Sequence, residues 1–153
     1  MRLTIAAVGR ARAGPERALY EHYAGRITWP LTLREVEEKR HLTPAELMRR
    51  EGELLLAACP ADAMLIGLDR RGRTISSEEL ASLLQRCRLQ GPDEVAFLIG
   101  GAEGHGEAVR KACRKTISFG AATWPHLLAR AMLAEQIYRA QQIIAGHPYH
   151  RGS

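Results

Sequence analysis

Five short strand-like runs alternate with segments of helical pattern along this 153-residue chain, and no other feature restricts its fold as strongly. Three of the runs are almost continuously apolar, too short for helices and bounded by turn-forming or charged residues, which is typical of buried strands. A fourth alternates with period two, as a strand with one wetter face does. The expected strands cover residues 3–8, 31–36, 63–68, 94–99 and 115–119.

Helix signals lie between these strands. Thr43-Pro44-Ala45-Glu46 and Ser76-Ser77-Glu78-Glu79 are capping boxes, in which a side chain satisfies the open N–H groups of a helix start. The expected helices cover about 15–26, 43–59, 76–90, 108–113 and 125–145. Strands that alternate with helices predict an α/β fold, a mainly parallel sheet with helices on both faces. The length suits one domain over residues 1–153.

The final helix carries more apolar residues than the single stripe that a surface helix needs. Something must cover its second face. In so short a chain we expect a second copy to do so, which predicts a two-fold homodimer.

The charge indicates which class of binding partner suits the protein, and the cysteine content indicates in which cellular compartment it works. The net charge is +5, the pI is about 9.5, and the basic residues are clustered. Such clusters suit a polyanionic partner, although composition alone favours the simpler interpretation, solvated faces on a mildly basic protein. Three cysteines without a C-x-x-C pair indicate reduced thiols. No apolar run reaches about 18 residues, so we expect no membrane span and a cytoplasmic protein.

A glycine-rich loop, residues 100–106, follows the strand at 94–99. Open parallel sheets bind ligands beyond the carboxyl ends of their strands, so a nucleotide-like ligand is one interpretation. The dinucleotide pattern is missing, and Glu107 stands where a P-loop has lysine, which argues against NAD and ATP. The alternative is that these glycines only permit a tight turn.

Titratable side chains gather at the end of the chain, in His147-Pro148-Tyr149-His150. They could form part of a site or a solubilising tail. We expect no metal there, because no carboxylate or thiol set with ligand spacing accompanies them. The chain also has no G-x-S-x-G elbow, and no histidine motif lies near a cysteine, so nothing supports covalent catalysis.

Four motifs taken together resemble those of the RlmH family, small ribosomal methyltransferases of the SPOUT superfamily. They are Ile99-Gly100-Gly101-Ala102-Glu103-Gly104, Thr123-Trp124-Pro125-His126, Glu135-Gln136-Ile137-Tyr138-Arg139-Ala140 and Gly146-His147-Pro148-Tyr149-His150. The resemblance extends over essentially the whole chain. It implies an enzyme that moves a methyl group from S-adenosylmethionine to N3 of a pseudouridine in 23S ribosomal RNA, with the assembled ribosome as partner. It also implies a homodimer with a C-terminal trefoil knot.

The resemblance further implies that backbone groups of the knot hold the adenosyl ligand. The matching residues are Leu68, Gly100, Phe119, Gly120, Ala121, Ala122, Thr123 and Trp124. The chain departs from the common family pattern at Ala102, where proline is usual, at Trp124, where leucine is usual, and at Phe119-Gly120, where Leu-Ser is frequent. Backbone contacts tolerate such changes.

Three residues match positions suited to the chemistry: Arg139, Tyr149 and His150. A cation such as Arg139 would stabilise the anion that forms as N3 loses its proton. Tyr149 or His150 would orient the base or relay its proton. We expect the tail of one subunit to complete the pocket of the other. Two alternatives stay open, a non-catalytic ribosome-associated RNA-binding module and a SPOUT methyltransferase that acts on tRNA; the terminal His-Pro-Tyr-His argues against the second.

Overall fold

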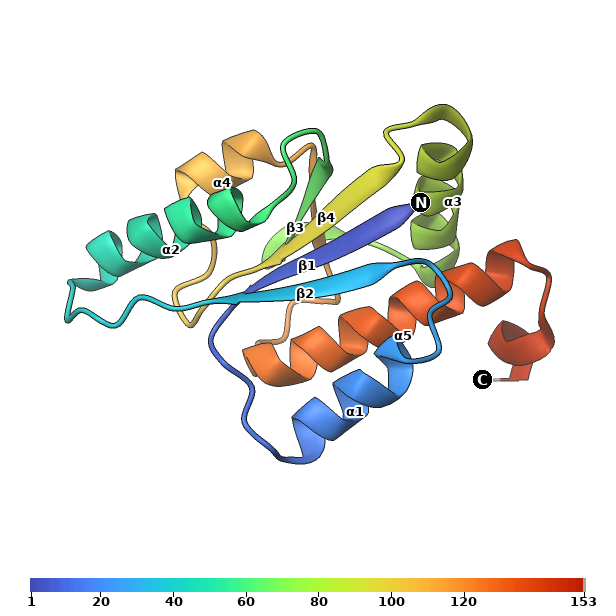
Figure 1. Ribbon diagram of the computed structural model, residues 1–153, viewed down its shortest axis with the longest axis horizontal. Coiled ribbons are helices and arrows are strands. Elements are labelled where there is room, and N and C mark those ends of the chain that lie inside the picture. Colours follow the sequence, from blue (N-terminus) through green and yellow to red (C-terminus); the bar gives the residue numbers. More distant parts are fainter. Residues whose placement is uncertain (153) are drawn as a thin grey trace.

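The computed structural model describes residues 1–152, which contain one five-stranded sheet in the order β2-β1-β4-β3-β5 (Figure 1). All four pairs of neighbouring strands are parallel, as the alternation of strands and helices predicts. The strands are β1 (Arg2–Val8), β2 (Leu31–Val36), β3 (Met64–Thr74), β4 (Glu94–Ile99) and β5 (Lys115–Ser118).

Helices cover both faces of this sheet. In Figure 1, α2 and α4 lie on one face, and α1, α3 and α5 lie on the other. The helices are α1 (Pro15–Ala24), α2 (Pro44–Ala58), α3 (Ser77–Gln90), α4 (Glu107–Ala112) and α5 (His126–Ile144), followed by a 3-10 helix, η1 (Pro148–Gly152). Within residues 1–152, no helix combines the length and apolar character needed to cross a membrane.

The capping boxes form as predicted. The side-chain oxygens of Thr43 and Ser76 accept hydrogen bonds from the N–H groups of Glu46 and Glu79, and each glutamate accepts one in return. These short-range interactions set the starts of α2 and α3. The predicted positions of the strands agree with the structure to within a residue or two, except at the end of β3.

The prediction that the third strand ends at residue 68 is wrong, because β3 continues to Thr74. The strand pairs with β5 twice, once before and once after a register shift between Leu68 and Arg73. The intervening segment bulges out of the ladder. A Cβ at Gly72 would lie 2.7 Å from the carbonyl carbon of Thr116, so the two chains are in direct backbone contact there. No pattern in the sequence predicts η1, which packs against α5.

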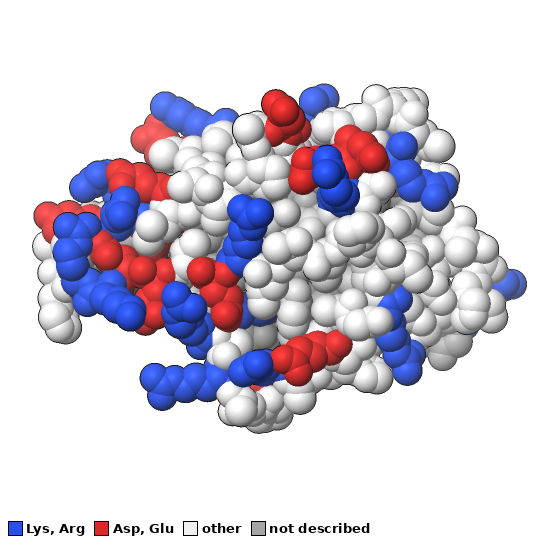
Figure 2. All heavy atoms as spheres, in the orientation of Figure 1, with Lys and Arg blue, Asp and Glu red and all other residues white. Residues whose placement is uncertain are grey.

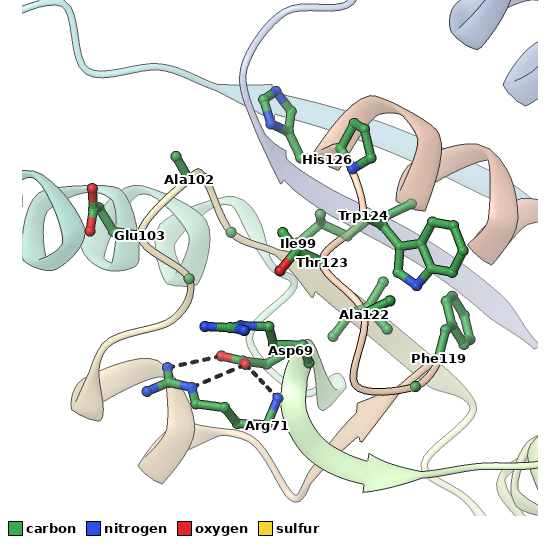
Figure 3. A pocket seen from close by; sticks show the side chains of 18 residues that line it. Asp69, Arg71, Ile99, Ala102, Glu103, Phe119, Ala122, Thr123, Trp124 and His126 are labelled. Carbon is green, nitrogen blue, oxygen red and sulfur yellow. Dashed lines mark hydrogen bonds and ion pairs between the residues drawn. The ribbon is translucent and has the colours of Figure 1, made fainter.

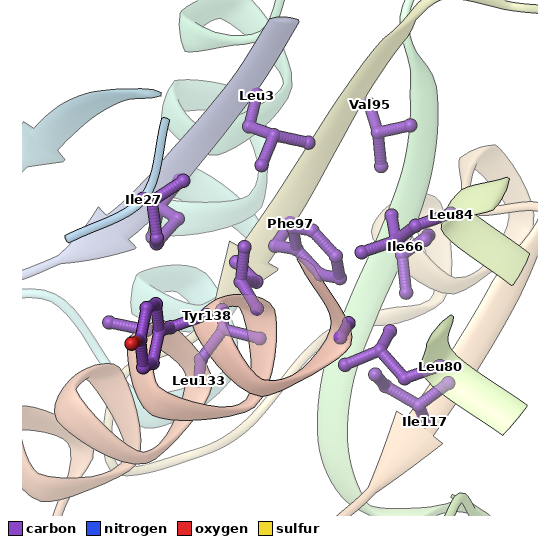
Figure 4. Packing of buried hydrophobic residues seen from close by; sticks show 14 of the residues in the cluster. Leu3, Ile27, Ile66, Leu80, Leu84, Val95, Phe97, Ile117, Leu133 and Tyr138 are labelled. Atoms are coloured by element: carbon purple, nitrogen blue, oxygen red, sulfur yellow. The ribbon is translucent and has the colours of Figure 1, made fainter. Parts of the chain in front are cut away.

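The larger of two cores fills the space between the sheet and α1, α3 and α5. Phe97 of β4 lies at its centre, fully buried, with Ile66 of β3, Leu84 of α3 and Leu133 of α5 around it (Figure 4). A smaller core lies beneath α2 and α4. The two cores fix the sheet between the helix layers and hold the strand ends in place.

The apolar surplus of α5 is largely covered within one chain. This helix packs against α1 on one side and α3 on the other, and Leu133 and Ile137 are fully buried. The surplus therefore does not itself require a second copy, and the predicted homodimer depends on the family resemblance instead.

Candidate functional site

Three segments converge where β4 and β5 end and β3 bulges, and they enclose a cavity of about 560 Å³, which we call the loop hollow. The segments lie within residues 68–71, 99–104 and 119–129. The volume is in the range of small-molecule sites, and the position is the one at which parallel sheets bind ligands. Phe119 and Trp124 lie on one side of the hollow, and the Asp69–Arg71 pair lies on another (Figure 3).

Seven of the eight residues predicted to hold the adenosyl ligand line the loop hollow. They are Leu68, Gly100, Phe119, Gly120, Ala122, Thr123 and Trp124, whereas Ala121 is not among the lining residues. Small side chains leave the main chain accessible there. Gly120 has a φ of +111°, a conformation that favours glycine, and a Cβ added to it would meet nothing within 4 Å. Its N–H donates to the Ser118 hydroxyl at 3.1 Å.

An ionic brace of Asp69, Arg71 and His105 joins two of the converging segments. The Asp69 carboxylate accepts hydrogen bonds from the N–H of Arg71 at 2.9 Å, from its guanidinium at 3.2 and 3.3 Å, and from the N–H of His105 at 3.4 Å. Arg71 also donates to the carbonyl of His105 at 3.2 Å. Burial alone would raise the pKa of Asp69, but these hydrogen bonds outweigh it and lower that pKa to about 2. The carboxylate therefore stays charged at neutral pH.

His105 belongs to the glycine-rich loop, and its ring packs beside Gly67 and Gly100. It is 2% exposed, and burial lowers its pKa, so the ring is neutral at pH 7. Its Nε2 lies 2.8 Å from the carbonyl oxygen of Leu98 and donates to it, while Nδ1 has no partner among the described residues. A Cβ at Gly100 would lie 3.2 Å from Nδ1 and 3.1 Å from the backbone of Gly104. A side chain at position 100 would thus push this part of the chain away from Gly104 and the His105 ring.

The predicted chemical residues form a second cluster at the far end of α5. The Arg139 Nε donates to Glu135 at 2.8 Å, and the Tyr149 hydroxyl donates to the same carboxylate oxygen at 3.2 Å. The His150 Nδ1 lies 3.2 Å from Arg139 Nη1, and its Nε2 lies 2.6 Å from Glu78. The hydrogen bond to Glu135 raises the pKa of Arg139, and burial raises that of Tyr149. Both groups are therefore protonated at neutral pH.

The loop hollow and this tail cluster do not meet within one chain. His126 lines the hollow, and Arg139 follows it by 13 residues along α5, which corresponds to about 20 Å of helix. The structure brings the ligand-holding residues together in one place and the chemical residues together in another.

Sequence reasoning missed five members of these two groups: Asp69, Arg71 and His105 of the brace, and Glu135 and Glu78 of the tail cluster. A signal existed only for Glu135, which precedes Arg139 by four residues, the spacing of a helical ion pair. Asp69 and Arg71 lie just beyond the predicted end of the third strand at residue 68. His105 contacts Asp69 across 36 residues, a pairing that no local pattern reveals.

Surface charges and thiols add little to either group. On the face shown in Figure 2, Lys, Arg, Asp and Glu intermingle over the end formed by α2 and the segment after β2, where several ion pairs lie.

Burial raises the pKa of Cys59 and Cys113 to about 11, so neither thiol supplies a thiolate at neutral pH. Among residues 1–152, no group of three His, Cys, Asp or Glu side chains has a metal-binding arrangement.

Comparisons with known proteins agree with this geometry. A family model described as predicted SPOUT methyltransferase matches residues 1–150. The chain is 56% identical to a protein named ribosomal RNA large subunit methyltransferase H from Rhodospirillum centenum and 54% identical to one of the same name from Paramagnetospirillum magneticum. Each alignment covers 151 residues and 99% of both chains. A solved structure of a probable methylase family protein from Haemophilus influenzae Rd KW20 is similar in fold, with a TM-score of 0.59 and 13% identity over 96% of this chain and 69% of that one.

Proposed function

The chain belongs to the SPOUT methyltransferase family, and from that premise we propose that it methylates ribosomal RNA of the large subunit with S-adenosylmethionine as methyl donor. The finer assignment is N3 of a pseudouridine in 23S RNA, on assembled ribosomes in the cytoplasm. It rests on the motifs at residues 99–104, 123–126, 135–140 and 146–150.

One observation supports this proposal above the others, the fit of the loop hollow to an adenosyl ligand. The hollow has the volume of a small-molecule site, and its walls expose main chain at glycine and alanine positions. Peptide N–H and C=O groups match the hydrogen-bonding edge of an adenine. Arg70 and Arg71 also line it and suit a ligand carboxylate, while Phe119 and Trp124 offer apolar rings.

The tail cluster supplies groups for the target base. Bound S-adenosylmethionine would supply an electrophilic methyl group, so the protein has mainly to align the base and ease loss of its N3 proton. Arg139, fixed by Glu135, would stabilise the negative charge that develops on the base. Tyr149 stays protonated and donates to Glu135, so its hydroxyl oxygen can accept a hydrogen bond from the base and orient it. His150, whose Nε2 contacts Glu78, would relay the proton.

A homodimer reconciles the separation of the two groups. Because the loop hollow and the tail cluster lie at opposite ends of α5, a catalytic site that needs both is completed by the tail of a partner subunit. The trefoil knot belongs to the same proposal. The double pairing of β3 with β5 and the backbone contact at Gly72 support a tight crossing of these segments.

Calorimetry with S-adenosylmethionine, followed by methyl transfer to purified ribosomes, tests the activity. We expect saturable heat and one methyl group per ribosome, located on a pseudouridine. Binding of RNA without any heat from S-adenosylmethionine would instead indicate a non-catalytic module, and methylation of tRNA alone would contradict the ribosomal substrate.

Variants of the tail test the residue roles. Tyr149→Phe and His150→Ala should slow methyl transfer while the affinity for S-adenosylmethionine changes less than twofold, and His41→Ala is the control. Equal losses of rate and affinity would refute the assignment. Co-expression of Gly100→Val and His150→Ala subunits should restore part of the activity if sites are shared, and no restoration would show that each chain builds its own site.

A further inference from the structure

A second cavity, of about 570 Å³, lies at the edge of the sheet formed by β5 and is not used by the proposed chemistry. We call it the edge hollow. Its walls come from the far end of β3, from α3 and from β5, and each element contributes one cation: Arg73, Arg86 and Lys115. Among the described strands, β5 pairs only with β3, so the outer edge of β5 is open.

The cations of the edge hollow lack anionic partners. Elsewhere on the surface, Arg2, Arg17, Arg49 and Lys111 each form an ion pair with a nearby glutamate. Within residues 1–152, by contrast, Arg73, Arg86 and Lys115 take part in no ion pair within 4.0 Å. Three cations without an ion-pair partner among the described residues therefore lie around one hollow.

The two glutamates in the wall of the edge hollow are engaged elsewhere. A Glu79 carboxylate oxygen accepts from the N–H of Ser76 at 3.2 Å in the cap of α3, and a Glu78 oxygen lies 2.6 Å from His150 Nε2. The hydrogen bond from His150 lowers the pKa of Glu78. Among the described residues, neither acid forms an ion pair within 4.0 Å with Arg73, Arg86 or Lys115.

A fourth cation, Arg114, directly precedes Lys115 in the chain, although it does not line the edge hollow. Arg86, Arg114 and Lys115 all act on the Cys87 thiol, where their charges partly oppose the rise in pKa that burial causes. Three positive charges, from α3 and from the start of β5 with the residue before it, therefore lie near enough to one buried thiol to act on it. Converging cations without counterions favour an anion with several charges along its length.

The edge hollow adjoins the tail cluster, since Glu78 belongs to its wall and contacts His150. We propose that the edge hollow binds the sugar–phosphate backbone of the ribosomal RNA strand next to the target nucleotide, with Arg73, Arg86 and Lys115 contacting phosphates. This inference rests on the proposed function. A strand held there would enter the tail cluster directly, and phosphate contacts of this kind set register without reading sequence.

Neutralising the three cations tests the assignment. Arg73→Gln, Arg86→Gln and Lys115→Gln are combined in one variant. The charge-matched control combines Arg2→Gln, Arg17→Gln and Arg49→Gln, which are exposed and paired. Loss of three phosphate contacts should raise KM for ribosomes on the order of tenfold to 100-fold and lower the slope of log affinity against log salt by about 2 to 3. The kcat, the affinity for S-adenosylmethionine and the melting temperature should match those of the control.

Two results would overturn the inference. One is a KM and salt slope equal to those of the control variant, and the other is a parallel loss of S-adenosylmethionine affinity, which would tie these cations to the loop hollow. Failure of the proposed function is distinguishable, because the wild-type protein would then leave ribosomes unmethylated. In that case co-sedimentation with ribosomes, compared between the two variants, still decides whether the edge hollow binds RNA.

Discussion

Replacing Asp69 by asparagine removes the charge that joins the bulged part of β3 to the glycine-rich loop. The Asp69 side chain is only 4% exposed and accepts hydrogen bonds from both Arg71 and His105. Its pKa in the folded protein is about 2, against an ordinary value of 3.8. That difference corresponds to about 2 kcal/mol of folding free energy carried by the charged form.

The sign of the pH dependence follows from the direction of this shift. Because the folded state has the lower pKa, the contribution of Asp69 is complete above about pH 4 and disappears as the pH falls through about 2. Urea unfolding should therefore show that Asp69→Asn is less stable than wild type by about 2 kcal/mol at pH 7, with about half of that difference left near pH 3. A looser brace should also weaken the binding of S-adenosylmethionine.

The control for this experiment is Asp62→Asn. Asp62 is exposed and forms no ion pair with the rest of the described chain, so its replacement should change stability by less than about 0.5 kcal/mol. The reasoning fails if Asp69→Asn is as stable as this control at pH 7. It fails equally if the loss persists undiminished at pH 3, since the charge would then not be its source.

Two further substitutions test how the segments around the sites are held. Gly72→Ala would place a Cβ 2.7 Å from the Thr116 backbone and should lower the free energy of unfolding by about 1–3 kcal/mol in urea melts. The control is Gly14→Ala, where the added Cβ would lie 3.7 Å from the nearest atom, so the free energy of unfolding should not change. Equal stability of the two variants would contradict the close packing of β3 on β5. Arg130 is 1% exposed and donates to Glu35 at 2.6 Å. Arg130→Met should lower the free energy of unfolding by about 2 kcal/mol, a smaller loss than breaking a fully buried ion pair would cause, because the Glu35 side chain is 24% exposed. Part of that loss should return in the Arg130→Met/Glu35→Gln double variant, and a loss below about 1 kcal/mol would show that the pair matters little.

Much of the fold could be predicted because its signals are local. The capping boxes at Thr43 and Ser76 fix two helix starts through contacts three residues apart, and the apolar runs that form β1 and β4 are readable without tertiary context. The candidate ligand-holding residues came from motifs, and most of them line one hollow. Ala121 does not, which shows the limit of carrying over a continuous run.

What the sequence determined by itself is the order of strands and helices, the parallel sheet that this order requires, and the residue types offered at the strand ends. The tertiary structure alone decided which of those residues meet. The second pairing of β3 with β5, the brace between Asp69 and His105, and the placing of Arg73, Arg86 and Lys115 around one cavity all join positions far apart in the chain. Such contacts depend on packing and backbone approach between distant segments, and no short window of sequence contains both partners.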